Sequence, residues 1–130
     1  MKPEKTNPFS LQKRLASFRH AFNGIRLAIS GEHNMRIHLF AAIIVTGAGF
    51  YFKLSSGEWI VLVFAMGFVL AAELFNSSIE SLSDFISPNQ HIDIGKIKDL
   101  AAGGVLVAVL ASVIAGILVF WPHFKLFFKI

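Results

Sequence analysis

The sequence predicts an all-α membrane protein with three transmembrane helices preceded by an amphipathic surface helix. Hydrophobic residues make up 55% of the 130 residues, charged residues only 15%, and the mean hydropathy is +0.64. Three long apolar runs alternate with short polar segments, and a basic segment with a helical apolar period precedes the first run. Soluble domains of this size are far less apolar, so we expect residues 1–130 to form one compact membrane domain.

The first 30 residues predict a tail followed by a surface helix. Residues 1–8 have the polar composition of a frayed terminus, and we expect disorder there. Over residues 9–30 apolar side chains recur every three or four positions, and the basic residues take other positions: Lys13, Arg14, Arg19 and Arg26. This pattern favours a basic amphipathic helix lying on a membrane, with an ordinary bundle helix as the alternative. Gly31 should end or kink it.

The first two predicted spans cover residues 35–52 and 59–86. Between them, the sequence LSSG of residues 54–57 predicts a tight turn, and Trp59 begins the second span as an interfacial aromatic anchor. The second span is longer than the bilayer core requires, so its last turns should project into headgroups and water.

The third predicted span covers residues 99–121. Before it, Pro88 should break the preceding helix, and we expect residues 92–98 to form a polar link. Pro122 should end the span. Small residues recur along it every four positions and favour close helix packing; they are Gly104, Ala108, Ser112 and Gly116.

Basic residues predict the orientation of the chain. Of the 12 lysines and arginines, seven lie in the segment that ends at Arg36 and two in the link over residues 87–99. The other three are Lys53, Lys125 and Lys129. Because basic residues favour the cytoplasmic side, we expect a multi-pass protein of the inner (cytoplasmic) membrane with a cytoplasmic N-terminus. The N-terminal segment lacks a small-residue cleavage site, so we expect no removable signal peptide.

The second span carries the clearest chemical signal. On a helix of about 100° per residue, Glu73, Glu80 and Asp84 lie within roughly 20° of one line, with Asn76 about 60° to one side. Glu73 lies about 21 Å along the span, inside the hydrocarbon, where an ionisable group is costly and therefore a functional candidate. Glu80 lies roughly 10 Å further, in the headgroup zone. The stripe predicts a site that moves a proton and holds a cation.

Two other charged clusters should reach the same cytoplasmic interface. Glu32 and Arg36 begin the first span, and Lys98 and Asp99 begin the third. One or two carboxylates, here Glu32 and Glu80, together with substrate phosphates are the usual ligands of magnesium in nucleotide sites. An ammonium beside them, such as that of Lys98, suits a phosphate group.

Several functional classes find no support in the sequence. The chain has no cysteine, which excludes thiol chemistry. It has no GxxxxGK phosphate loop, no histidine pair at metal-binding spacing and no nucleic-acid-binding module. A small ion or proton translocator remains an alternative, because an intramembrane glutamate also serves a proton path. A non-catalytic membrane adaptor is a third interpretation.

Three sequence blocks resemble the small prokaryotic integral-membrane diacylglycerol kinases and their undecaprenol kinase relatives. The most specific block is ELFNSSIESLSDFIS, residues 73–87, which is similar to the family pattern E-L-x-N-[ST]-x-I-E-x-x-x-D. IKDLAAGGV, residues 97–105, and GEHNMRIH, residues 31–38, resemble two further family blocks in the same order and at matching separations.

This resemblance implies a homotrimeric lipid kinase that transfers the γ-phosphoryl group of ATP to the hydroxyl of a membrane lipid. By similarity, Glu73 would be the general base, and Glu32 and Glu80 would coordinate the magnesium of Mg-ATP. The remaining family positions would bind ATP, support the site or contact the lipid: His91, Lys98 and Asp99 on the nucleotide, Asn76 and Asp84 as supporting residues, and Arg36 with Glu73 at the lipid.

The resemblance leaves the acceptor open between diacylglycerol and undecaprenol. The first helix has Lys13 and His20 near positions where the best-known diacylglycerol kinases have Arg and Tyr. The segments EHNMRIH, GEW (residues 57–59) and WPHF (residues 121–124) are more similar to the undecaprenol kinase branch, which favours a polyprenol.

Overall fold

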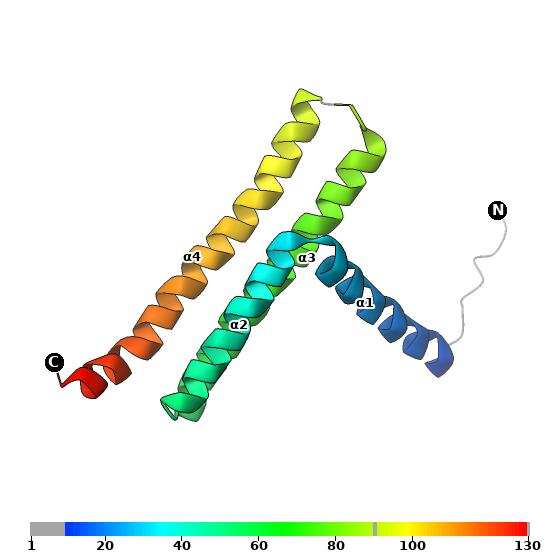
Figure 1. Cartoon of the computed structure of the whole chain (residues 1–130). Coiled ribbons are helices and arrows are strands. Elements are labelled where there is room, and N and C mark those ends of the chain that lie inside the picture. Colours follow the sequence, from blue (N-terminus) through cyan, green and yellow to red (C-terminus); the bar gives the residue numbers. More distant parts are fainter. Residues whose placement is uncertain (1–9, 90, 130) are drawn as a thin grey trace, which may run out of the picture.

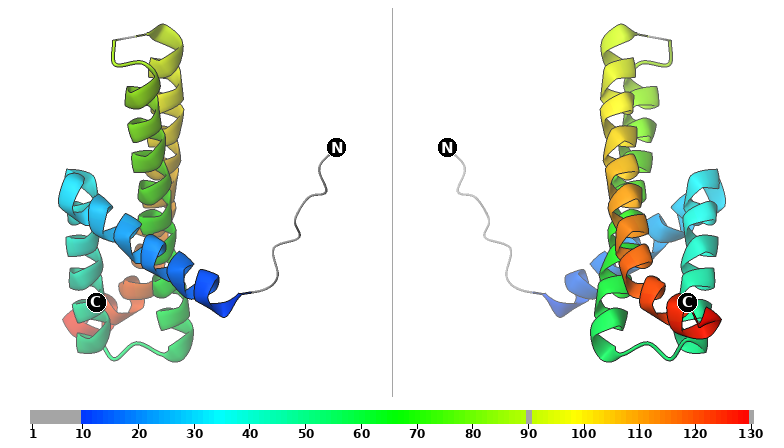
Figure 2. Two further views of the ribbon diagram at one scale, coloured as in Figure 1. Left: turned by 90° about the vertical axis from the view of Figure 1, so that its right-hand side faces the viewer. Right: turned by 90° about the vertical axis from the view of Figure 1, so that its left-hand side faces the viewer.

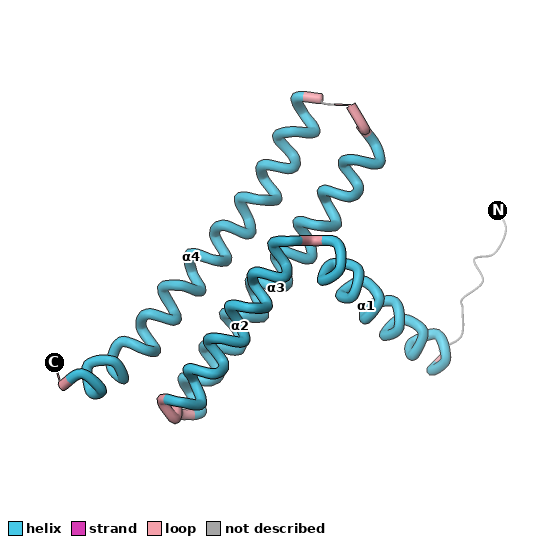
Figure 3. The backbone as a smooth tube through the Cα atoms, in the orientation of Figure 1, coloured by secondary structure: helices cyan, strands magenta, loops and turns pink. Residues whose placement is uncertain are grey.

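The computed structural model describes residues 10–89 and 91–129, and these residues form four α-helices joined by short loops (Figure 3). The helices are α1 (Leu11–Gly31), α2 (His33–Tyr51), α3 (Ser56–Ile86) and α4 (Ile92–Phe128). The long helices α3 and α4 run antiparallel side by side, and α2 packs on α3 (Figure 1). The predicted tail over residues 1–8 lies outside the described residues.

Helix α1 diverges from the bundle at the start of α2 (Figure 2). It ends at Gly31, as predicted, and Glu32 links the two helices in an extended conformation. The large apolar residues in the first part of α1 do not pack on the rest of the chain: Phe18 is 64% exposed and Phe22 is 70% exposed, whereas Ala28 near its end is buried. Within a single chain, therefore, α1 is not an ordinary bundle helix.

The turn between α2 and α3 is fixed by backbone and side-chain contacts. Lys53 adopts a left-handed conformation with φ of 54°. Ser55 caps α3, because its backbone N–H donates to Glu58 Oε2 at 2.7 Å while the Glu58 N–H donates to Ser55 Oγ at 3.4 Å. This capping box starts α3 at Ser56, earlier than the predicted start at Trp59.

Gly49 allows α2 to approach Trp59 of α3 closely. A Cβ atom at Gly49 would lie 2.7 Å from Trp59 Cη2, whereas one at Gly47 would meet nothing within 4 Å. We expect Gly49→Ala to destabilise the protein by about 1–3 kcal/mol through overpacking, partly offset by the better helix propensity of alanine. Thermal unfolding in detergent measures this. Gly47→Ala is the matched control and should unfold at or slightly above the wild-type temperature; equal midpoints for the two variants would contradict the prediction.

The small residues of α4 mediate its contact with α3. Ala108 is completely buried, and Ser112 Oγ donates a hydrogen bond to the Ala65 carbonyl oxygen at 3.0 Å. Leu62 of α3, only 1% exposed, packs in the core beside Val119. The predicted stripe therefore faces α3 over its middle turns, as small-residue stripes in membrane helices commonly do.

The predicted polar link over residues 92–98 is wrong, because α4 begins at Ile92. His91 caps this end: its Nδ1 accepts a hydrogen bond from the Asp93 backbone N–H at 3.2 Å. Asp93 lies in the first turn, where its negative charge interacts favourably with the helix dipole. Lys96 Nζ donates a hydrogen bond to its Oδ1 at 3.0 Å. The polarity of this segment suggested a loop, but a cap and a local ion pair stabilise it as a helix.

The prediction that Pro122 ends the last helix is also wrong, since α4 continues to Phe128. The helix bends toward this end (Figure 2), which is the usual effect of an internal proline. Contacts with the α2–α3 turn hold the bent segment: the Phe124 ring lies 5.1 Å from that of Phe52, and His123 Nε2 lies 2.7 Å from Glu58 Oε1.

Two of the described helices, α3 and α4, have the length and apolarity needed to cross a membrane. Helix α2 has 19 residues and is long enough, but it is less apolar than α3 and α4 because polar residues occupy its first two turns. They are His33, Asn34, Arg36 and His38.

Candidate functional site

Two polar side chains are buried near the middle of α3 without complete hydrogen bonding. Glu73 is 2% exposed and Asn76 is 5% exposed. Glu73 Oε2 and Asn76 Oδ1 have no hydrogen-bond partner among the described residues. Because buried polar atoms are almost always paired, these two oxygens mark a place where a group from outside the chain would complete the bonding.

Other charged side chains lie close enough to act on Glu73. The electrostatic interactions of its carboxylate are with His38, Glu80 and Glu32. Glu80, one to two turns further along α3, is half-buried and accepts a hydrogen bond from Asn76 Nδ2 at its Oε1 at 3.2 Å. The structure therefore brings three predicted carboxylates from α3 and from the α1–α2 junction into one neighbourhood.

Glu32 faces α3 across a hollow lined by both polar and apolar side chains. The hollow has a volume of about 300 Å³ and lies between α1 and α3. Serine hydroxyls of α3 line its other side, and Ser77, itself buried, donates to the Glu73 carbonyl oxygen at 2.9 Å. Among the described residues, no three His, Asp or Glu side chains come together as metal ligands. A metal at Glu32 and Glu80 would therefore need further ligands from a bound molecule.

A second hollow, of about 470 Å³, lies where α3 ends and α4 begins. Asp84 and Lys98 line it, and Lys98 Nζ donates to Asp84 Oδ1 at 2.9 Å. The ammonium of Lys98 also interacts electrostatically with Glu80. Glu80 is thus the residue that connects the buried carboxylate of Glu73 with the cation at the polar end of α4.

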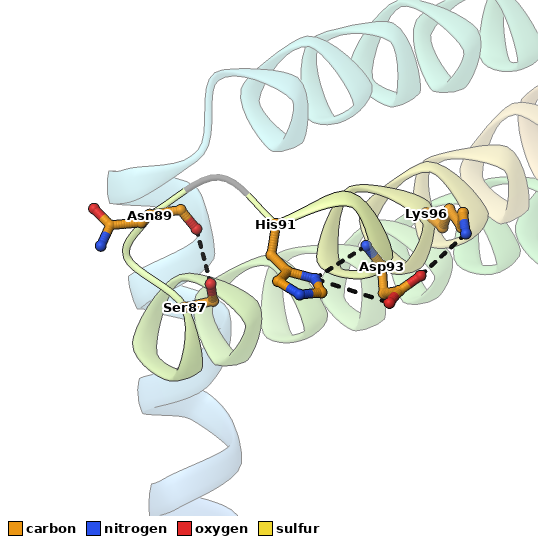
Figure 4. A network of polar contacts seen from close by, with 5 residues as sticks. All are labelled: Ser87, Asn89, His91, Asp93 and Lys96. Carbon is orange, nitrogen blue, oxygen red and sulfur yellow. Dashed lines mark hydrogen bonds and ion pairs between the residues drawn. The ribbon is translucent and has the colours of Figure 1, made fainter.

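The described residues on both sides of the α3–α4 connection make local polar contacts (Figure 4). Ser87 Oγ donates to the Asn89 carbonyl oxygen at 2.8 Å, and the His91 ring lies 3.9 Å from Asp93 Oδ2. His91 also lines the second hollow, together with Asp84 and Lys98. The predicted nucleotide-site residues His91 and Lys98 therefore share one surface with Asp84, which was predicted to support the site.

Two predicted site residues lie apart from these groups. Asp99 is exposed, about 100° around α4 from Lys98, and makes no hydrogen bond or ion pair with another described residue. Arg36 is also exposed, and its guanidinium donates to the Ser30 carbonyl oxygen at 3.3 Å, at the end of α1.

Sequence reasoning did not single out two histidines that the structure places in polar contacts. His38 is near Glu73, and His123 pairs with Glu58 at the opposite end of the bundle, where both side chains are largely buried. His38 follows the GEHNMR segment on the face of α2 toward α3, which was a usable signal. The partner of His123 is 65 residues away in sequence, and nothing local indicates it.

The arrangement combines three chemical elements. A buried carboxylate can accept a proton, two nearby carboxylates can hold a hydrated divalent cation, and a lysine can neutralise an anion at the polar end of the helices. The first lies deep in an apolar bundle and the last lies at its polar rim. This combination suits a reaction between an apolar alcohol and a polyanion.

The chain is similar to proteins of one family. The model of the prokaryotic diacylglycerol kinase family matches residues 19–120. An undecaprenol kinase of Bacillus subtilis is 37% identical over 112 residues, which cover 86% of this chain and 91% of that protein. A diacylglycerol kinase of Synechocystis is 35% identical over 117 residues, covering 88% and 67%. The diacylglycerol kinase of Escherichia coli K12 is 26% identical over 105 residues, covering 81% and 86%.

Proposed function

The chain belongs to the prokaryotic diacylglycerol kinase family, and from this we propose that it transfers the γ-phosphoryl group of Mg-ATP to a membrane lipid hydroxyl at the cytoplasmic interface. The family makes it a lipid kinase and hence a phosphotransferase, and with the two long apolar helices it makes it a membrane protein. The site residues and their roles are part of the proposal.

The observation that carries the proposed mechanism is the buried, incompletely bonded carboxylate of Glu73. It is 2% exposed, so water has little access to it, and a lipid alcohol would reach it where the packing around α3 opens. Its unpaired Oε2 is placed to accept the hydroxyl proton as the lipid oxygen attacks the γ-phosphorus. The same attack in bulk water would favour hydrolysis, which burial of the base suppresses.

The donor set around Glu73 fits a magnesium ion carried by ATP. Glu32 and Glu80 offer carboxylate oxygens, and Asn76 holds one oxygen of Glu80 in place. Two carboxylates plus phosphate oxygens are ligands that suit magnesium, and such a site needs no third protein ligand beyond what the described residues offer. When bound, the metal offsets the charge on the phosphate oxygens during transfer.

The second hollow would receive the nucleotide. Lys98 would leave Asp84 to contact phosphate, because a triphosphate offers more negative charge than one exposed carboxylate. His91 lines the same hollow and would contact the nucleotide, and Asp99 would do so from the adjacent face of α4. Asp84 would then support the site rather than neutralise the lysine.

We also propose the placement of the chain in the inner membrane. Helices α2, α3 and α4 would span it with the N-terminus in the cytoplasm, and the exposed apolar stripe of α1 would lie on the cytoplasmic surface. Arg36, at the α1–α2 junction, would contact the lipid headgroup. The large apolar side chains on the outside of α3 and α4 support lipid contacts and further helix contacts in a homotrimer.

An ion or proton translocator is less well supported. The ionisable groups cluster at one end of the bundle, and α3 has no ionisable side chain from Trp59 to Ala72. The Glu58–His123 pair at the other end is therefore about 15 residues, or roughly 22 Å, from Glu73, too far for proton transfer without intermediate groups.

Purified protein in mixed micelles with Mg-ATP should phosphorylate a lipid alcohol. In a competition between undecaprenol and diacylglycerol at equal mole fraction, we expect more labelled undecaprenyl phosphate, because the EHNMRIH, GEW and WPHF segments resemble the undecaprenol kinase branch. The readout is the ratio of labelled lipids separated by chromatography. A preference for diacylglycerol would reverse the acceptor assignment, and no labelled lipid with either would overturn the proposed function.

A further inference from the structure

His38 is the one titratable residue among the described residues that line an apolar cavity between α2, α3 and α4. The cavity has a volume of about 220 Å³ and extends from His38 to Phe120. Apart from the hydroxyl of Ser112, which is bonded to a backbone carbonyl, the rest of its lining is apolar. His38 is half-buried at the edge of this cavity, whose lining includes Leu70 of α3, and Glu73 lies one turn further along the same face of α3.

The pairing of α2 with α3 places His38 at the depth of Glu73. Thr46 Oγ1 lies 3.8 Å from Met66 Sδ, which fixes the register of the two antiparallel helices. His38 precedes Thr46 by eight residues and Glu73 follows Met66 by seven, so both lie about 11–12 Å from this contact in the same direction. The electrostatic interaction between His38 and Glu73 is consistent with this placement.

The proposed chemistry requires a way out for a proton. Each transfer would leave the hydroxyl proton on Glu73, which is 2% exposed and has no bonded partner at Oε2. A second turnover needs the carboxylate back, so the proton must pass to a group with better access to water. Glu32 and Glu80 would be engaged by magnesium in the proposed site, so His38 is the neighbour of Glu73 that is left to take the proton onward.

We propose that His38 is a proton-relay residue that acts through Glu73, receiving the lipid hydroxyl proton from the carboxyl group and releasing it to water; this inference rests on the proposed function. In the step, the lipid O–H bond breaks as the bond from that oxygen to the γ-phosphorus forms, and ADP leaves with the electrons of the broken P–O bond. The proton goes to Glu73, then to the imidazole, then to water.

The charged groups around Glu73 and His38 come from several elements. Glu80 and Glu32 interact electrostatically with Glu73, and Glu32 immediately precedes α2, the helix of His38. Arg36 directs its guanidinium to the Ser30 carbonyl oxygen of α1 instead. Helix α4 contributes no titratable side chain to the cavity, and neither does the described part of α1.

The test is the pH profile of lipid phosphorylation by His38→Gln at saturating Mg-ATP and lipid. We expect kcat at pH 7 to fall about tenfold to a hundredfold, at or below the low end of general acid–base effects. Because the relay ends with release of the proton to water, the wild-type kcat should fall as the pH is lowered below neutrality, and that of the variant should fall much less. The KM for ATP should stay within twofold, because His38 lies outside the nucleotide hollow.

His33→Gln is the matched control, since it makes the same change on an exposed residue of the same helix. Its pH profile should overlay that of the wild type. Ionisation of Mg-ATP changes the profiles of all the proteins in the same way, so it does not affect the comparison. His38→Asn is a second variant that removes the imidazole, and the thermal unfolding temperature of both variants is measured. A loss of kcat in a variant that unfolds at the wild-type temperature reflects lost chemistry rather than a folding defect. If the pH profiles of both His38 variants ran parallel to that of the wild type, or if kcat were unchanged, the relay would be overturned. Failure of the wild type on both lipids would overturn the proposed function instead.

Discussion

Glu73→Gln should reduce lipid phosphorylation by about 10²- to 10⁴-fold, the range measured for loss of a general base. Glutamine keeps the volume of the side chain and its place in the buried cluster, but its amide does not accept the hydroxyl proton. Binding of Mg-nucleotide should persist, because the nucleotide groups lie at the polar ends of α3 and α4. Turnover measured with labelled ATP, beside nucleotide binding measured by calorimetry, separates the two effects.

Glu58→Gln is the matched control for this prediction. It makes the same change on the same helix, at the end that pairs with His123. We expect it to lower the unfolding temperature, because it weakens both the capping box and the contact with α4, while kcat stays within about threefold of the wild type. A Glu73→Gln variant with wild-type turnover would show that another residue is the base.

Glu80→Gln should weaken the apparent affinity for magnesium by about tenfold to a hundredfold or more. Residues that only support metal ligands already have effects of about this size. Asn76 already occupies Oε1 of Glu80, so the other carboxylate oxygen is the one available to a metal. An amide is a much poorer ligand than a carboxylate for a hard divalent cation. The measurement is the magnesium dependence of activity at fixed ATP.

Asp93→Asn controls for the loss of a negative charge at the same end of the bundle. Asp93 is exposed, and its ion pair with Lys96 lies outside the proposed site. The apparent magnesium affinity of this variant should equal that of the wild type. If Glu80→Gln and Asp93→Asn had equal effects, general electrostatics rather than metal coordination would account for both.

The helices of this chain were largely predictable because their apolar periods are long and their turns carry strong signals. Gly31 ends α1, and the turn before Glu58 has its capping residue at Ser55. The two errors came from local rules of limited reach: a cap and a local ion pair make residues 92–98 helical, and tertiary contacts override the proline in α4. Pro122 does not end α4, because the aromatic and polar contacts beyond it compensate for one lost hydrogen bond.

The candidate site was predictable in part for a different reason. The spacing of Glu73 and Glu80 places both on one face of a helix, which depends only on helical geometry. The unpaired oxygen of Glu73 and the position of His38 depend on how α2 pairs with α3, and that register follows from packing such as Trp59 against Gly49. The sequence gives no direct measure of this register.

Helix α4 has 37 residues and is therefore about 55 Å long, well beyond a hydrocarbon thickness of about 30 Å. Its uncharged stretch, residues 100–122, can tilt to match thicker or thinner bilayers. Because the Ser112–Ala65 and Lys98–Asp84 contacts couple α4 to α3, the two helices would tilt together. Hydrophobic mismatch would then change the angle of the pair to the membrane normal and leave the spacing between the apolar and polar parts of the site intact.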